Sequence, residues 1–101
     1  ASAQKKLEER GLKSSLIVDC SHGNSGKDHN IQPRVLRDLI RQRMSNAGVV
    51  GLMLESHLSE GNQTLGPDPA ILKHGVSITD ACIGWEETDR IIREAHTELN
   101  G

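Results

Sequence analysis

The sequence has almost no aromatic side chains: it contains no phenylalanine, no tyrosine and a single tryptophan, Trp85. Aromatic residues usually supply a large share of the area buried in a protein core. Any core here must therefore be built from Leu, Ile, Val and Met. A chain of 101 residues also buries only a limited fraction of its surface. Together these shortages favour a piece of a larger structure over a domain that folds by itself.

Other absences exclude whole classes of protein. The longest apolar run is far shorter than the roughly 20 residues of a membrane helix, and the charged segment 1–10 lacks the apolar stretch of a signal peptide. The net charge is −2, with no basic patch of the kind that binds nucleic acid. Two cysteines, Cys20 and Cys82, do not make a disulfide-rich chain. We therefore expect a cytoplasmic protein that binds neither nucleic acid nor a membrane.

Two short apolar runs, residues 15–19 and 49–54, predict β-strands. Neither run alternates apolar with polar residues, which is typical of strands buried on both faces of a parallel sheet. Helical patterns cover residues 2–10, 33–45 and 85–99, and Pro33 suits the first turn of the second helix. Strands that alternate with helices predict an α/β fold with right-handed crossovers between parallel strands.

Two parallel strands do not form a stable sheet alone, because both faces and both edges need cover. A (β/α)8 TIM barrel provides that cover with eight such units and typically about 250 residues. We therefore interpret residues 1–101 as the C-terminal βα units of a TIM barrel, that is, as a fragment of a single larger domain. The polar residues gather after the C-terminal ends of the strands, where barrel enzymes keep their active sites.

Three polar clusters, at residues 19–24, 55–58 and 79–82, supply candidate metal ligands. His22, Glu55 and Asp80 would form a mixed nitrogen and oxygen site that suits a divalent first-row metal. Spacing alone is a weak argument, since these residues are far apart in sequence and charged loop residues are usually just solvated. His57 follows Glu55 by two residues, so strand alternation can point both the same way and make His57 a supporting residue outside the ligand set.

Three longer stretches, residues 18–25 (VDCSHGNS), 54–63 (LESHLSEGNQ) and 77–86 (SITDACIGWE), closely resemble the C-terminal motifs of the type I 3-deoxy-D-arabino-heptulosonate 7-phosphate (DAHP) synthases. They have that family's order and spacing. The resemblance implies that His22, Glu55 and Asp80 bind the catalytic metal. The family's fourth ligand is a cysteine from an early barrel strand, and no residue here corresponds to it. Cys20 is not in that position.

The resemblance also implies an activity: condensation of phosphoenolpyruvate with D-erythrose 4-phosphate, with release of phosphate, as the first step of the shikimate route to aromatic amino acids. The implied cofactor is a divalent metal, and this ligand set suits Mn, Fe, Co and Zn. Most phosphate-binding residues of the family come from earlier strands, so we expect this chain to be inactive alone. The full enzyme is expected to be a homo-oligomer. The alternative is a stand-alone, non-catalytic βα domain that binds a partner or a metal weakly.

Overall fold

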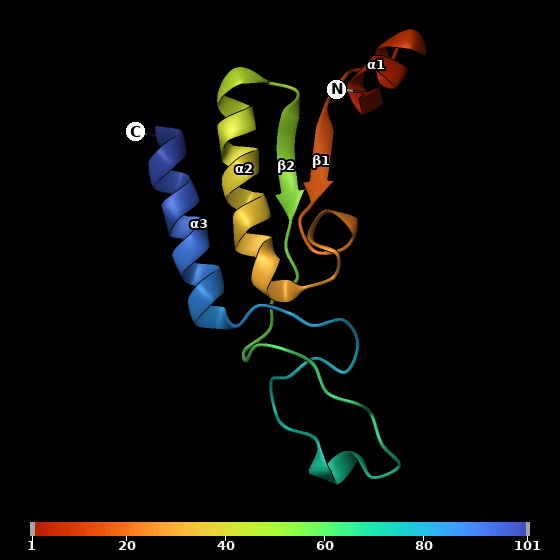
Figure 1. Ribbon diagram of the computed structural model, residues 1–101, viewed down its shortest axis with the longest axis vertical. Coiled ribbons are helices and arrows are strands. Elements are labelled where there is room, and N and C mark those ends of the chain that lie inside the picture. Colours follow the sequence, from red (N-terminus) through yellow and green to blue (C-terminus); the bar gives the residue numbers. More distant parts are fainter. Residues whose placement is uncertain (1, 101) are drawn as a thin grey trace.

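The structure, a computed structural model, describes residues 2–100 (Figure 1). The helices are α1 (Ser2–Glu9), α2 (Gln32–Ser45) and α3 (Trp85–Asn100), and the strands are β1 (Leu16–Asp19) and β2 (Val49–Met53). Short 3-10 turns occupy Gly23–Ser25, His29–Ile31 and Pro69–Ile71. Each helix and strand lies within one residue of the bounds that the sequence patterns predict.

The two strands pair in parallel, and α2 connects them. Val18 lies opposite Leu52 and Asp19 opposite Met53, with an irregularity in the register after Leu16. Both strands point toward the same end of the molecule, from which the segments that follow them emerge (Figure 1). The structure therefore confirms a mixed helix and strand fold with a parallel βαβ connection.

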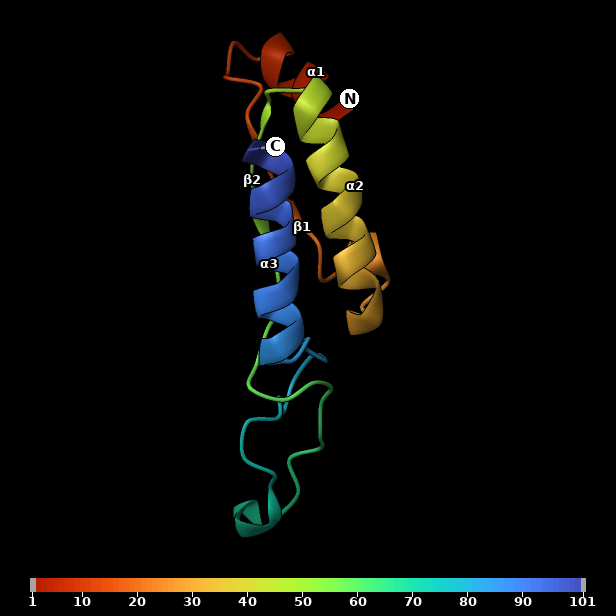
Figure 2. The same cartoon turned by 90° about the vertical axis from the view of Figure 1, so that its left-hand side faces the viewer.

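One face of the sheet packs on α2. Cys20, Leu39 and Val49 form a buried cluster between the strands and this helix. A second cluster joins α2 to α3, which lie side by side in Figures 1 and 2; it consists of Leu36, Ile40, Ile83 and Ile91. Both clusters thus lie on the helical side of the sheet, and aliphatic side chains and Cys20 build them.

The other face of the sheet is open. Ile17 and Met53 point toward it, because strand alternation sets them opposite to Val18 and Leu52. Their side chains are 72% and 43% exposed. The prediction that these strands are buried on both faces is therefore wrong for this chain, since none of the elements within residues 2–100 covers the second face.

The molecule is a thin layer rather than a compact body, with extents of 51 × 34 × 17 Å. Its accessible surface is 7094 Å², whereas a compact monomer of this mass exposes about 5,600 Å². Its radius of gyration is 16.4 Å, against about 13 Å for a compact domain of 100 residues. No helix among residues 2–100 is long and apolar enough to cross a membrane.

A long segment between β2 and α3 extends away from the helices and strands before it returns (Figure 1). Isolated bridges join its two arms: Ser56 pairs with Ile83, Gly61 with Cys82, and Asn62 with Ser77. These bridges bring residue 80 back to the end of the sheet where β1 and β2 stop.

Candidate metal site

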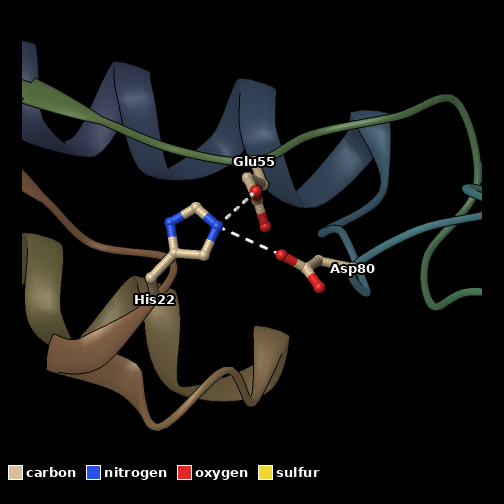
Figure 3. A group of neighbouring side chains, drawn as sticks. All are labelled: His22, Glu55 and Asp80. Atoms are coloured by element: carbon tan, nitrogen blue, oxygen red, sulfur yellow. Dashed lines mark hydrogen bonds and ion pairs between the residues drawn. The ribbon is translucent and has the colours of Figure 1, made fainter.

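His22, Glu55 and Asp80 meet at the carboxyl end of the sheet, as Figure 3 shows. His22 follows β1, Glu55 follows β2, and Asp80 lies near the end of the long segment that leads into α3. The imidazole Nε2 lies 3.0 Å from Oε1 of Glu55 and 3.1 Å from Oδ2 of Asp80. One donor atom from each of the three residues lies within 4.8 Å of the others. The structure therefore brings the three predicted ligands together.

The spacing of these donor atoms fits one metal ion. Bonds of about 2.0 to 2.2 Å to nitrogen and oxygen donors place neighbouring donors about 3.0 to 3.5 Å apart. The two distances from Nε2 fall in that range. One imidazole and two carboxylates suit divalent first-row metals. All three side chains are partly exposed, so the site is open to further ligands.

Asp19, the last residue of β1, holds the imidazole of His22 in this orientation. Its Oδ2 lies 2.6 Å from Nδ1 of His22, and its Oδ1 accepts hydrogen bonds from the backbone N–H and the hydroxyl of Ser21. The ring nitrogen that remains, Nε2, faces Glu55 and Asp80 (Figure 3). A histidine that binds a metal commonly has such a carboxylate on its other nitrogen.

The charges of the cluster favour a cation. Hydrogen bonds from Ser21, and to a smaller extent from His22, hold the pKa of Asp19 far below its usual range. The hydrogen bond to Asp19 raises the pKa of His22, and the charges of Asp19 and Glu55 add to this effect. Three carboxylates therefore stabilise positive charge at the imidazole. A divalent ion at Nε2 would meet the same negative field.

The sequence interpretation assigned no role to Asp19. The available signal was its position: an acidic residue that ends an apolar strand three residues before a candidate histidine ligand. Spacing does not reveal that the intervening turn folds Asp19 back onto Nδ1. That turn is a local structure, in which Asn24 also donates a hydrogen bond to the carbonyl of Asp19.

The structure does not bring His57 to this group. Its side chain is exposed, and its Nδ1 accepts a hydrogen bond from the backbone N–H of Leu58 at 2.8 Å. Among residues 2–100, the ligand atoms that lie within 4.8 Å of one another come from His22, Glu55 and Asp80, without His57. Asp19 occupies the supporting position for which His57 was the candidate.

The two cysteines are buried free thiols. Cys20 is fully buried beside Leu39 and Val49, and burial raises its pKa to about 11. Burial also raises the pKa of Cys82. Among residues 2–100, the ligand atoms that lie within 4.8 Å of one another come from His22, Glu55 and Asp80, and neither cysteine belongs to this group. This agrees with the interpretation that Cys20 does not supply the fourth ligand.

Comparisons with known proteins agree with the motifs. A family model described as the DAHP synthetase I family matches residues 1–93. The chain is 49% identical over 102 residues to the Tyr-sensitive phospho-2-dehydro-3-deoxyheptonate aldolase of Escherichia coli K12, and this match covers 100% of the chain and 29% of the relative. The Phe-sensitive enzyme of the same organism is 42% identical over 95 residues, which cover 93% of the chain and 27% of the relative.

A solved structure resembles the fold closely. The phospho-2-dehydro-3-deoxyheptonate aldolase of Francisella tularensis SCHU S4 superposes with a TM-score of 0.87 and 36% sequence identity. The match covers 95% of this chain and 28% of that one. The chain thus spans about 29% of the length of the E. coli Tyr-sensitive relative.

Proposed function

Because this chain belongs to the DAHP synthetase I family, we propose that it is the C-terminal part of a 3-deoxy-7-phosphoheptulonate synthase. The longer protein is called the parent enzyme below. It condenses phosphoenolpyruvate with D-erythrose 4-phosphate and releases phosphate, as the first step of aromatic amino acid biosynthesis. The observation that carries this proposal is the convergence of His22, Glu55 and Asp80 at one end of a parallel sheet.

The proposal includes a barrel: residues 1–101 are the C-terminal βα units of a (β/α)8 domain. Three features support it. The β1–α2–β2 connection is a parallel unit of the kind that barrels repeat. The open face, with Ile17 and Met53, is apolar, as the interior of a barrel is. The candidate site lies at the carboxyl ends of the strands, where active sites of barrels lie.

Within the parent enzyme, Nε2 of His22 and one carboxylate oxygen each from Glu55 and Asp80 would hold Mn, Fe, Co or Zn. A further ligand would come from outside this chain. When bound, the metal supplies Lewis-acid polarisation of the aldehyde oxygen of the sugar substrate. Asp19 keeps the imidazole in place by accepting the hydrogen of Nδ1. Most groups that bind the two phosphates would lie in the rest of the barrel, so the chain alone would be inactive.

Two further parts of the proposal follow from the family and from the thiols. The parent enzyme would be a homo-oligomer, which light scattering of the purified protein would test. It would work in the reducing cytoplasm, an environment in which the free thiols Cys20 and Cys82 persist.

Replacement of one ligand in the parent enzyme tests the function. We expect Asp80→Ala to abolish both phosphate release and tight Mn²⁺ binding, because a ligand set of one imidazole and one carboxylate from this chain is too small to hold the ion. Asp38→Ala is the matched control, since Asp38 is an exposed carboxylate on α2. Retained turnover in Asp80→Ala would contradict the ligand assignment.

A metal titration of the 101-residue chain alone tests its dependence on the rest of the barrel. We expect much weaker binding than in the parent enzyme, because part of the ligand set is missing. Tight binding of one equivalent would contradict the proposal and would favour a stand-alone metal-binding domain.

A further inference from the structure

Gln32, the first residue of α2, is a fully buried amide at the edge of the metal site. A buried amide is costly unless its donors and acceptor are paired. Its Oε1 accepts a hydrogen bond from the backbone N–H of Glu55 at 2.9 Å, and its Nε2 donates to the backbone carbonyl of Glu55 at 3.3 Å. One side chain therefore binds both backbone polar groups of one candidate metal ligand.

These two bonds replace a missing strand partner. The paired part of the sheet ends where Asp19 lies opposite Met53, and the last bond beyond it runs from the N–H of Cys20 to the carbonyl of Met53. Glu55, two residues further on, has no partner in β1. The Gln32 amide presents a donor and an acceptor side by side, as a neighbouring strand would.

The carbonyl of Glu55 also accepts a bond from the N–H of Ile83 at 3.0 Å. Ile83 follows Asp80 by three residues, and Gln32 ends the segment that begins at His22. The backbone of Glu55 is therefore the point where the segments that carry all three ligands are joined. Rotation of this backbone would move the Glu55 carboxylate relative to Nε2 of His22, which lies 3.0 Å away.

We propose that Gln32 is a positioning residue for the metal site, which holds the Glu55 carboxylate at the ion through its two hydrogen bonds to the Glu55 backbone. This inference rests on the proposed function, because it requires Glu55 to bind a metal. In this role Gln32 acts through the backbone of Glu55 rather than on the metal. It sets the geometry of one ligand, and loss of such support typically weakens metal binding by about 10- to 100-fold.

The test is a Co²⁺ titration of the parent enzyme, followed by the visible absorption of the bound ion. We expect Gln32→Met, which keeps the length of the side chain and removes both hydrogen bonds, to weaken Co²⁺ binding about 10- to 100-fold and to alter the spectrum. Gln32→Asn, which keeps the amide but is too short to make both bonds, should weaken it less and remains informative if the Met variant fails to fold.

Two controls on the same helix separate positioning from stability. Ile40→Ala removes a buried side chain of α2 and should lower the melting temperature while Co²⁺ affinity stays within about twofold, because Ile40 belongs to the apolar cluster between α2 and α3. Gln42→Met makes the same substitution at an exposed position of α2 and should change neither quantity. Near-normal affinity in both Gln32 variants, or an equal loss in Ile40→Ala, would overturn the inference.

His22→Ala distinguishes this outcome from failure of the proposed function. If the unmodified parent enzyme binds Co²⁺ and His22→Ala does not, the site is correct and the Gln32 variants decide the inference. If His22→Ala binds Co²⁺ as well as the unmodified enzyme does, the metal site itself is wrong, and the proposal for Gln32 is wrong with it.

Discussion

The two faces of the sheet differ in what covers them. The face toward α2 holds the buried cluster of Cys20, Leu39 and Val49. The face toward Ile17 and Met53 has no cover within residues 2–100, although these two side chains are apolar. Each Å² of apolar surface removed from water stabilises a protein by about 25 cal/mol. The chain therefore buries a cluster of apolar side chains on one face, whereas Ile17 and Met53 stay exposed on the other.

The open face also leads to the metal site. Asp19 points to the same side as Ile17 by strand alternation, and its carboxylate contacts His22. The covered face thus supplies buried apolar contacts, whereas the open face ends at the candidate metal site. This division is what one side of a barrel wall requires: helices outside, and side chains that converge at one end inside.

A charged side chain on the open face gives the largest expected effect. Ile17→Asp should destabilise the parent enzyme by about 3 kcal/mol or more, because the rest of the barrel would enclose the unpaired carboxylate. Denaturant unfolding of the purified variants measures this loss. The matched control is Met44→Asp: Met44 is 67% exposed and Ile17 is 72% exposed in this chain.

We expect Met44→Asp to change the stability of the parent enzyme by no more than about 1 kcal/mol, since Met44 is an exposed residue in the last turn of α2. Equal effects at the two positions would mean that the open face stays exposed in the parent enzyme. The barrel proposal would then be wrong. Because Ile17 and Met44 are similarly exposed in this chain, only burial of the open face in the parent enzyme would make the two substitutions differ.

A smaller effect is expected where the open face meets the site. Asp19→Asn keeps the size of the side chain but removes the negative charge next to Nδ1 of His22. Metal affinity should therefore fall about 10- to 100-fold. Calorimetric titration of the parent enzyme with Mn²⁺ measures the change. Asp89→Asn on α3, where the carboxylate pairs with Arg93, is the control and should bind Mn²⁺ normally. An unchanged affinity in Asp19→Asn would remove Asp19 from the site.

The sequence predicts the elements well because their signals are local. Continuous apolar runs mark both strands, and Pro33 and the three-and-four spacing of apolar residues mark α2. The three ligands were identified through motifs of a family rather than through spacing, because His22, Glu55 and Asp80 belong to separate segments. Their convergence depends on the parallel register and on the return of the long segment, which no local pattern encodes.

The supporting residues could not be predicted from the sequence, for a different reason. Asp19 and Gln32 act through hydrogen bonds to other residues: one to a ring nitrogen, the other to backbone groups 23 positions away in sequence. A polar residue at the start of a helix, such as Gln32, would ordinarily be expected in solvent. His57 is close to Glu55 in sequence, but its ring accepts a hydrogen bond from the backbone N–H of Leu58.

The smallest expected effect lies on the covered side, where Arg37 of α2 donates a hydrogen bond to Glu94 of α3 at 2.9 Å. That bond, together with the charges of Arg37 and Arg90, lowers the pKa of Glu94 in the folded protein. The ionised carboxylate is therefore favoured by folding, so its contribution to stability is present above the unfolded pKa of about 4.3 and is lost as the pH falls through the lower folded pKa.

Because these groups are partly exposed, Glu94→Gln should cause only a slight, salt-sensitive loss of stability in the parent enzyme at pH 7. The difference from the unmodified enzyme should shrink as the pH is lowered below about 4.3, which denaturant unfolding across that range would measure. A difference that stays constant down to the acid limit would mean that the α2–α3 contact depends on its apolar cluster alone and that the ion pair contributes nothing to the covered face.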